Sequence, residues 1–145
     1  MQQKIQNTFL VSLIMLFSVL VTGCKKENVE PISSLKGKCL QGRIITSERC
    51  TSAFYVQLLN AETGTTSTYN GKEYKNVISL GNIPKSMDLG ADYNKTFYFT
   101  IDNTTDFENC TEFSPCTQEY LPKVTPVRIR VCGKNFSTSG CPKAE

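Results

Sequence analysis

The sequence predicts an all-β domain, and three observations support that prediction. Apolar and polar residues alternate with a period of two in several short segments. Clusters of Gly, Pro, Asn and Asp separate these segments, and no long stretch beyond the N-terminal region shows the apolar spacing of a helix. Strands of this kind have one apolar and one polar face, which is typical of antiparallel sheets.

Three segments show the clearest alternation, and weaker strands are predicted at 39–46, 65–69 and 76–80. Asn70 and Gly71 both accept positive φ, so they predict a tight hairpin between two of the weaker strands. The residues expected on the inner faces of the three clearest strands are Phe54, Val56 and Leu58 in segment 53–59, Phe97, Phe99 and Ile101 in segment 95–102, and Val127, Ile129 and Val131 in segment 125–132.

Short strands at this spacing fit a small antiparallel barrel or a sandwich. Three strands, a connector near residues 84–91 with room for one helical turn, and two further strands resemble the order of an OB-fold whose helix is shortened or missing. This OB-like barrel is the favoured architecture. An immunoglobulin-like sandwich, which needs about seven strands, is the alternative.

The composition narrows the function classes. The chain has 145 residues, of which 39% are hydrophobic, with no Trp and a formal net charge of +3. Its lysines are scattered among acidic residues and form no basic stripe, so no nucleic-acid partner is expected. The absence of His excludes Ser-His-Asp and Cys-His catalysis and counts against the usual zinc sites. We therefore expect no enzyme activity, no catalytic residues, no cofactor and no bound metal.

An apolar run at residues 9–21 follows a short polar start that contains Lys4. At about 1.5 Å per residue the run spans roughly 20 Å, which is short of the roughly 30 Å hydrocarbon core of a bilayer. It therefore predicts a signal peptide, and a membrane-spanning helix is the less favoured alternative. The motif that follows, Val21-Thr22-Gly23-Cys24, resembles the lipobox of bacterial lipoproteins.

This resemblance implies how the N-terminus is processed. In that family the chain is cut just before the cysteine, a diacylglycerol is joined to the cysteine sulfur, and the new amino group is usually acylated. Residues 1–23 are then the signal peptide and Cys24 is the lipidation site. Two or more acyl chains anchor a protein stably, so the expected membrane contact is through this lipid.

Residues 24–34 show no hydrophobic period and predict a flexible tether, which leads to a single β domain at 35–145. Lys25 and Lys26 follow Cys24, whereas enteric lipoproteins retained in the inner membrane carry Asp near this point. The charged run is also similar to the tethers of small envelope lipoproteins of the Bacteroidota, some of which reach the cell surface. The resemblance thus implies an outer-membrane lipoprotein that faces the periplasm or the surface.

The seven cysteines are an odd number, and lipidation of Cys24 leaves an even set. An exported chain enters a compartment where disulfides persist, so three bridges are expected, each contributing about 2–4 kcal/mol. Two bridges plus a free pair, or a metal or redox role, are alternatives, and the pairing stays open. The candidate cysteines are Cys39, Cys50, Cys110, Cys116, Cys132 and Cys141.

Two surfaces are candidate binding sites. Tyr55 and Tyr98 are expected on outer strand faces, where they would form an exposed aromatic patch, although packing against a second layer is an alternative. Arg128 and Arg130 share one strand face and could bind an anion, although the polar face of a strand needs no ligand. The acidic segment 102–119 matches no EF-hand spacing and is interpreted as a solvated loop.

These observations predict a lipid-anchored envelope or cell-surface lipoprotein that acts as a non-enzymatic binding module. Its ligand is an unknown protein or glycan. A structural or inhibitor-like envelope component is the alternative, and a small hydrolase that uses paired carboxylates is less favoured.

Overall fold

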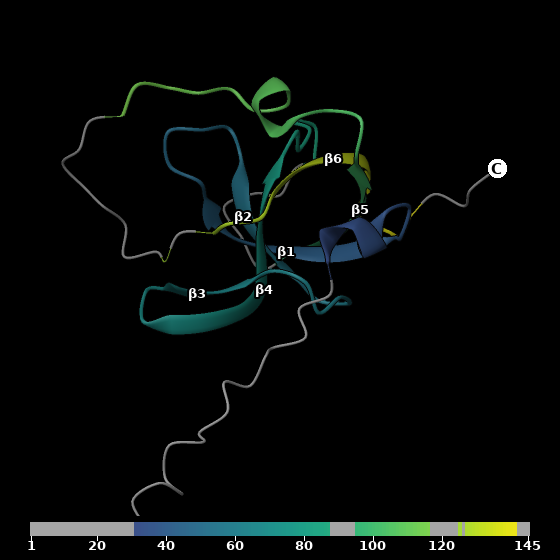
Figure 1. Cartoon of the computed structure of the whole chain (residues 1–145), viewed down its shortest axis with the longest axis horizontal. Helices are drawn as coiled ribbons and strands as arrows, with labels where there is room; N and C mark the ends of the chain where they lie inside the picture. Colours follow the sequence, from purple (N-terminus) through teal and green to yellow (C-terminus); the bar gives the residue numbers. More distant parts are fainter. Residues whose placement is uncertain (1–30, 88–94, 117–124, 126, 142–145) are drawn as a thin grey trace, which may run out of the picture.

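The structure is a computed structural model of the chain, and it describes residues 31–87, 95–116, 125 and 127–141. Within these residues the chain forms strands joined by loops and two short 3-10 helices (Figure 1). The elements in chain order are η1 (Ile32–Leu35), β1 (Leu40–Ser47), β2 (Phe54–Leu58), β3 (Thr65–Tyr69), β4 (Lys72–Gly81), β5 (Thr96–Asp102), η2 (Phe107–Asn109) and β6 (Arg130–Ser137). The all-β prediction is confirmed.

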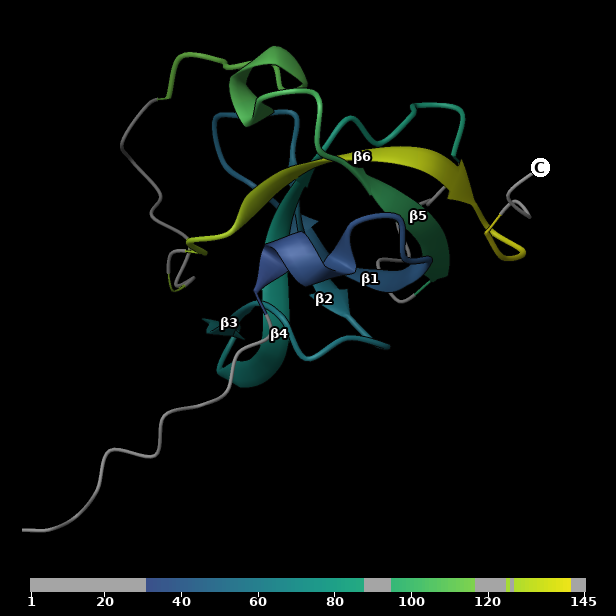
Figure 2. The ribbon, with the colours of Figure 1, turned by 45° about the vertical axis from the view of Figure 1, so that its right-hand side comes forward.

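Five strands close into a barrel, and β3 is added outside it (Figures 1 and 2). β1 lies between β2 and β5, β5 pairs with β6, β6 pairs with β4, and β4 returns to β2. The β4–β6 pair is parallel and the other pairs are antiparallel. Closure of the sheet gives each barrel strand a neighbour on both edges.

The order around the barrel is β1-β2-β4-β6-β5 and back to β1. This is the order of the five-stranded OB barrel, so the favoured prediction is confirmed and the immunoglobulin-like sandwich is not formed. The connector after β4 begins with one hydrogen-bonded turn, in which the Met87 amide donates to the Pro84 carbonyl at 3.0 Å. The rest of the predicted helical turn, from residue 88, lies outside the described residues.

The barrel interior is filled by the residues that the alternation placed on the inner faces of β2 and β5. Val56, Leu58, Phe97, Phe99 and Ile101 are buried. Their neighbours from other elements include Leu40, Ile44, Ile78 and Leu80, with the Phe136 ring of β6 stacked on the Phe99 ring. Phe54, the first residue of β2, is only partly buried.

The helix η1 is the part of the core that the pattern did not predict. Leu35 is fully buried and Ile32 packs against the same core. Residues three apart in a 3-10 helix lie on the same face, which explains why these two residues face the barrel together. The segment predicted as a tether up to residue 34 therefore already packs on the barrel from Ile32.

The two edges of β4 are occupied differently. β2 pairs along one edge, from Val77 to Leu80. The other edge is shared, because β3 takes the part up to Val77 and β6 takes the part from Ser79. The hairpin of β3 and β4 turns at Asn70 and Gly71, whose φ angles are 49° and 76°, as predicted.

This sharing corrects the predicted position of the last strand. The sequence predicts a strand at 125–132, whereas β6 begins at Arg130 and continues to Ser137. Ser79 pairs with Arg130 in a parallel register, so residues before Arg130 would have to pair with residues of β4 before Ser79. β3 already occupies that part of the β4 edge. Competition for one strand edge therefore moves the start of β6 along the chain.

The residues before β6 lie on the face of the β3–β4 hairpin. The Thr125 carbonyl accepts a hydrogen bond from the Ser67 hydroxyl at 3.1 Å. The sequence predicts that Val127 shares the inner face with Ile129 and Val131. Because of the position of this segment, Val127 packs in a second apolar cluster, and the prediction is wrong for this residue.

The second cluster lies on the outer side of the barrel and is built on Ile45, Val77 and Val127. Val77 alternates with the inward Ile78, so it points outward. Ile45 is the extra residue of a β-bulge, since Ile44 and Thr46 pair with adjacent residues of β2. The bulge redirects the Ile45 side chain to the outer cluster.

Gly42 provides a test of the barrel packing. A Cβ atom at this position would lie 2.7 Å from Val56 Cγ1 and 3.1 Å from the Phe97 ring. We expect Gly42→Ala to lower the free energy of unfolding by about 1–3 kcal/mol, the cost of overpacking a filled core. Denaturant unfolding measures the change, and Ser47→Ala, at an exposed position of the same strand, is the control. Equal stability of the two variants would contradict this account of the core.

Candidate functional site

All six cysteines of the predicted domain form disulfides. The bonds are Cys39–Cys141, Cys50–Cys116 and Cys110–Cys132, with Cα–Cα distances of 5.7, 5.4 and 6.0 Å. These distances lie in the usual range for disulfides. The prediction of a disulfide-braced domain is confirmed.

The Cys50–Cys116 bond joins two loops at one end of the barrel, residues 48–53 and 110–116, which we call the clamped loop pair. The first loop connects β1 to β2, and the second belongs to the long connection from β5 to β6. Figures 1 and 2 show both loops at the top of the barrel, while the described chain begins lower, below η1.

Hydrogen bonds hold the two loops together in addition to the disulfide. The Ser52 amide donates to the Glu112 carbonyl and the Ser114 amide donates to the Cys50 carbonyl, both at 2.9 Å. The Glu112 amide in turn donates to the Ser52 hydroxyl at 2.9 Å. Thr51 and Phe113 form an isolated antiparallel bridge, which completes a short ladder between the loops. These contacts give the loop pair one defined backbone conformation.

Phe113 stands at the centre of this ladder, yet its side chain is turned to solvent. The residue is 56% exposed, the highest value among the large apolar residues that the structure describes as exposed. The adjoining Glu112 and Ser114 are also exposed. The loop pair therefore presents an aromatic ring on a rigid support.

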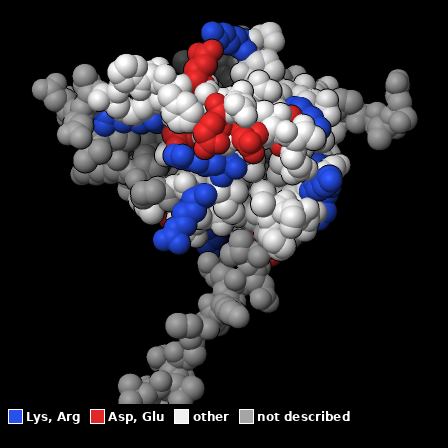
Figure 3. Space-filling view, turned by 45° about the horizontal axis from the view of Figure 1, so that its top comes forward, with Lys and Arg blue, Asp and Glu red and all other residues white. Residues whose placement is uncertain are grey.

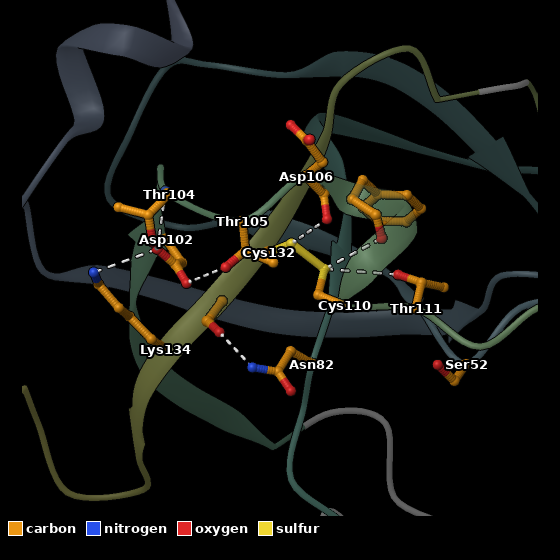
Figure 4. The surroundings of a disulfide bond; sticks show 12 residues. Ser52, Asn82, Asp102, Thr104, Thr105, Asp106, Cys110, Thr111, Cys132 and Lys134 are labelled. Atoms are coloured by element: carbon orange, nitrogen blue, oxygen red, sulfur yellow. Dashed lines mark hydrogen bonds and ion pairs between the residues drawn. A yellow bond between two sulfur atoms is a disulfide. The ribbon is translucent and has the colours of Figure 1, made fainter.

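The Cys110–Cys132 bond fastens the second loop to β6 (Figure 4). The Cys132 sulfur lies 3.4 Å from the Asp106 carbonyl oxygen, and the Thr111 hydroxyl lies 3.8 Å from the Cys110 sulfur. A Cβ atom at Gly81 would lie 2.6 Å from that hydroxyl and 2.8 Å from the Cys110 sulfur. Glycine at position 81 thus allows the loop to pack directly on the end of β4.

Acidic residues concentrate in the segment that carries η2 and the second loop. Residues 102–116 contain four acidic residues and no Lys or Arg, although the whole chain has a net charge of +3. Asp106, Glu108 and Glu112 are exposed. Figure 3, which turns the top of the molecule forward, shows acidic atoms grouped in the middle of this face with Lys and Arg around them.

Asp102, at the end of β5, has a structural role within this segment. Its carboxylate accepts hydrogen bonds from the Thr104 hydroxyl at 2.7 Å, the Thr104 amide at 3.0 Å and the Thr105 hydroxyl at 2.9 Å. These bonds, those from Thr104 first, hold the pKa of Asp102 well below its usual range. The turn that follows β5 is therefore capped by an ionised carboxylate, which Lys134 approaches at 3.5 Å (Figure 4).

A buried polar cluster lies beside the first loop. Glu48 is 5% exposed, and its carboxylate accepts hydrogen bonds from the Ser79 hydroxyl and from Arg130 Nη2, the latter at 2.8 Å. The Arg130 guanidinium also lies over the Phe107 ring, 5.4 Å from its centroid. The cluster links the β1–β2 loop, β4, β6 and η2. Ser79 is fully buried, so its hydroxyl has no access to a substrate in this conformation.

Tyr55 borders the same cluster. Burial raises the pKa of its phenol above the ordinary value, and the negative charge of Glu48 adds to this effect, while Arg130 opposes it. Tyr55 packs against the outer cluster of Ile45 and Val77, which is the second-layer packing that the sequence left as the alternative.

The structure does not bring Tyr55 and Tyr98 together. Tyr98 pairs with Gln41 of β1, and the Gln41 side-chain Nε2 donates to the Tyr98 hydroxyl at 3.3 Å. Tyr55 pairs instead with Thr46. Positions 41 and 46 are about 16 Å apart along a strand. The predicted aromatic patch is therefore not formed by these two residues.

Tyr69 and Tyr74 are the tyrosines that join Tyr55 at the outer cluster. The hairpin register places them on one face, because Tyr69 pairs with Lys72 and Tyr74 lies two residues further on. The Asn70-Gly71 turn signal, combined with this alternation, contained the information needed to find them.

The two arginines also differ from expectation, since Arg128 is exposed while the Arg130 charge is paired with Glu48.

No group of three or more His, Cys, Asp or Glu residues in the described ranges is arranged to hold a metal ion. The described helices include none with the length and apolar character needed to cross a bilayer. Comparison of the chain with protein-family models, with curated proteins and with solved structures found no match.

The Glu48–Arg130 pair yields a test of the polar cluster. We expect Arg130→Met to lower the free energy of unfolding by about 1–3 kcal/mol, because it leaves a buried carboxylate without its cation. Adding Glu48→Gln should recover part of the loss in a double-mutant cycle followed by denaturant unfolding.

Lys134→Met is the matched control for Arg130→Met. Lys134 lies on the same strand, and its side chain is 48% exposed against 47% for Arg130. Its partner Asp102 is more accessible than Glu48, so the loss should stay below about 1 kcal/mol. Equal losses in the two variants would show that burial of Glu48 does not matter.

Proposed function

We propose that this chain is a bacterial envelope lipoprotein, anchored through lipid on Cys24, whose barrel is a non-enzymatic binding module. The observation that carries the proposal is the use of the cysteines. Three disulfides account for six of the seven, and the remaining one is the cysteine of the lipobox-like motif Val21-Thr22-Gly23-Cys24. Disulfides of this kind persist in the oxidising compartments that exported proteins enter. Export to such a compartment is also what the N-terminal motif implies.

The clamped loop pair is the proposed contact surface. An aromatic ring held on a rigid backbone binds at low entropic cost, and aromatic residues are enriched among the few residues that dominate interface energies. Phe113 meets both conditions, since it is exposed and its neighbours are fixed by the disulfide and the loop ladder. The Phe113 ring belongs to neither apolar cluster of the described residues.

The charge of the segment that carries Phe113 indicates the chemistry of the partner. Asp106, Glu108 and Glu112 would repel phosphate groups and anionic headgroups, and would attract Lys or Arg. The partner that fits is therefore a protein with an apolar pocket for the ring and basic residues at its border. If that protein is an enzyme, the same loop pair would act as an inhibitor, which is the second candidate function that a rigid exposed loop favours.

Intact mass tests the anchor. For the chain purified in detergent from the bacterium that makes it, we expect the mass of residues 24–145 with three disulfides plus a diacylglycerol and an amide-linked acyl chain. Cys24→Ser should remain uncut and lose the added mass. An unprocessed start without fatty acid in the unmodified chain would refute the lipoprotein proposal.

Photo-cross-linking tests the contact surface. With a photoreactive phenylalanine analogue at position 113 of the full chain, illumination of intact cells should give one discrete cross-linked protein, identified by mass spectrometry. The same analogue at Leu59, the other exposed large apolar residue at 40%, is the matched control. Phe113→Ala should then lower the affinity for that protein by about 30-fold or more. Cross-linking at position 59 but not at 113 would place the contact elsewhere.

A further inference from the structure

The strand β3 differs from every other described strand in having one neighbour. It pairs with β4, and no described residue pairs with its second edge. The five barrel strands have neighbours on both edges. β3 is therefore the open edge of the described sheet, and Figure 1 shows it at the margin of the molecule, on the β3–β4 hairpin.

The hairpin geometry shows which backbone groups face that edge. Tyr69 and Lys72 close the two-residue turn, so the backbone groups of Tyr69 point toward β4. Hydrogen-bonding direction alternates along a strand, so the groups of Thr68 point away from β4, and so do those of Thr66. Two amides and two carbonyls therefore face the open edge.

The sequence of β3 lacks the features that usually protect an open edge. Natural edge strands carry charges, proline or a bulge that prevents pairing with another chain. β3 reads Thr-Thr-Ser-Thr-Tyr, with no charge and no proline, and the register shift in the hairpin places the additional residue on β4. Its partner β4 carries three charges in its first four residues, so the uncharged stretch is confined to the edge strand.

We propose that β3 pairs with β3 of a second copy of this chain, antiparallel and with its twofold axis at Ser67. In this register Thr66 of each chain lies opposite Thr68 of the other. Both residues direct their backbone groups toward the open edge, so the register satisfies all four groups with four interchain hydrogen bonds. Exposed Thr side chains then face each other on the outer side, a favourable cross-strand pair.

The absence of charge on β3 favours a second copy as the occupant. With the twofold axis at Ser67, position 66 lies opposite position 68 of the other copy, so charges of one sign at these two positions would repel each other across the axis. β3 carries no charge, so it matches an uncharged strand like itself. A pair of five-residue strands buries less than the roughly 1,000 Å² of a stable interface, so the dimer is weak when free and gains from confinement on a membrane.

Disulfide trapping tests the register in the full chain. Chains with Thr66→Cys and chains with Thr68→Cys are expressed together with different affinity tags. The two positions are opposite each other at about 5.5 Å between Cα atoms, within the range that a disulfide spans. We expect a cross-linked dimer that contains both tags. Either variant alone should give none above background, since like positions are about 8–9 Å apart.

Leu59→Cys, an exposed site away from β3, measures the background of random cross-linking. Equal cross-linking in the single variants and in the mixture would overturn the register. Absence of the mixed dimer, with the protein folded, would overturn the pairing. The test does not depend on lipid, because an unanchored chain can be assayed at high concentration in solution. Failure of the lipoprotein proposal would therefore leave the mixed dimer intact, whereas failure of the β3 pairing would remove it.

Charge exchange provides an independent test with the same chain. The double variant T66K/T68K places Lys opposite Lys across the axis and should abolish the dimer in sedimentation equilibrium. The variant T66K/T68E places Lys opposite Glu in both halves and should restore it. Loss of the dimer in both variants, with unchanged unfolding midpoints, would contradict the twofold arrangement.

Discussion

Pairing between β2 and β4 is the contact on which the rest of this structure depends, because it turns a six-stranded sheet into a closed barrel. An open sheet with the same strands would need a second layer to cover its apolar face. Closure lets the sheet cover itself, so a chain that is 39% hydrophobic can bury the Phe97 and Phe99 rings around its own axis. Gly42 is part of this solution, since the space its side chain would take is already filled by Val56 and the two rings.

Closure also determines where the loops meet. The β1–β2 loop and the β5–β6 connection emerge side by side, and the Cys50–Cys116 bond converts this proximity into a fixed arrangement. The Glu48–Arg130 pair secures the base of the same region, and the Cys110–Cys132 bond holds η2 on the end of β4 and β6. Covalent and ionic links are thus concentrated at the end of the barrel where the segments are irregular and the strand ladder cannot hold them.

The sequence predicted those elements whose signals are local. The alternation in β2 and β5, the Asn70-Gly71 turn and the length of β3 all depend on residues close in the chain. The start of β6 was predicted wrongly because β3, more than 50 residues earlier, occupies the edge it would need, and no local pattern records that competition. The same limit applies to the disulfide pairing and to the polar cluster. Glu48 lies in a loop, where an acidic residue usually remains in solvent, and only the fold brings Ser79 and Arg130 to it.

The Cys39–Cys141 bond has a mechanical consequence. It joins points 102 residues apart, at the entrance to β1 and just beyond the end of β6. Tension that arrives along the N-terminal segment is therefore divided between two strands as it enters the barrel. Because β1 has antiparallel neighbours on both sides, a pull along its axis shears many hydrogen bonds at once and cannot open them singly. The fold is well suited to resist drag applied through its N-terminus.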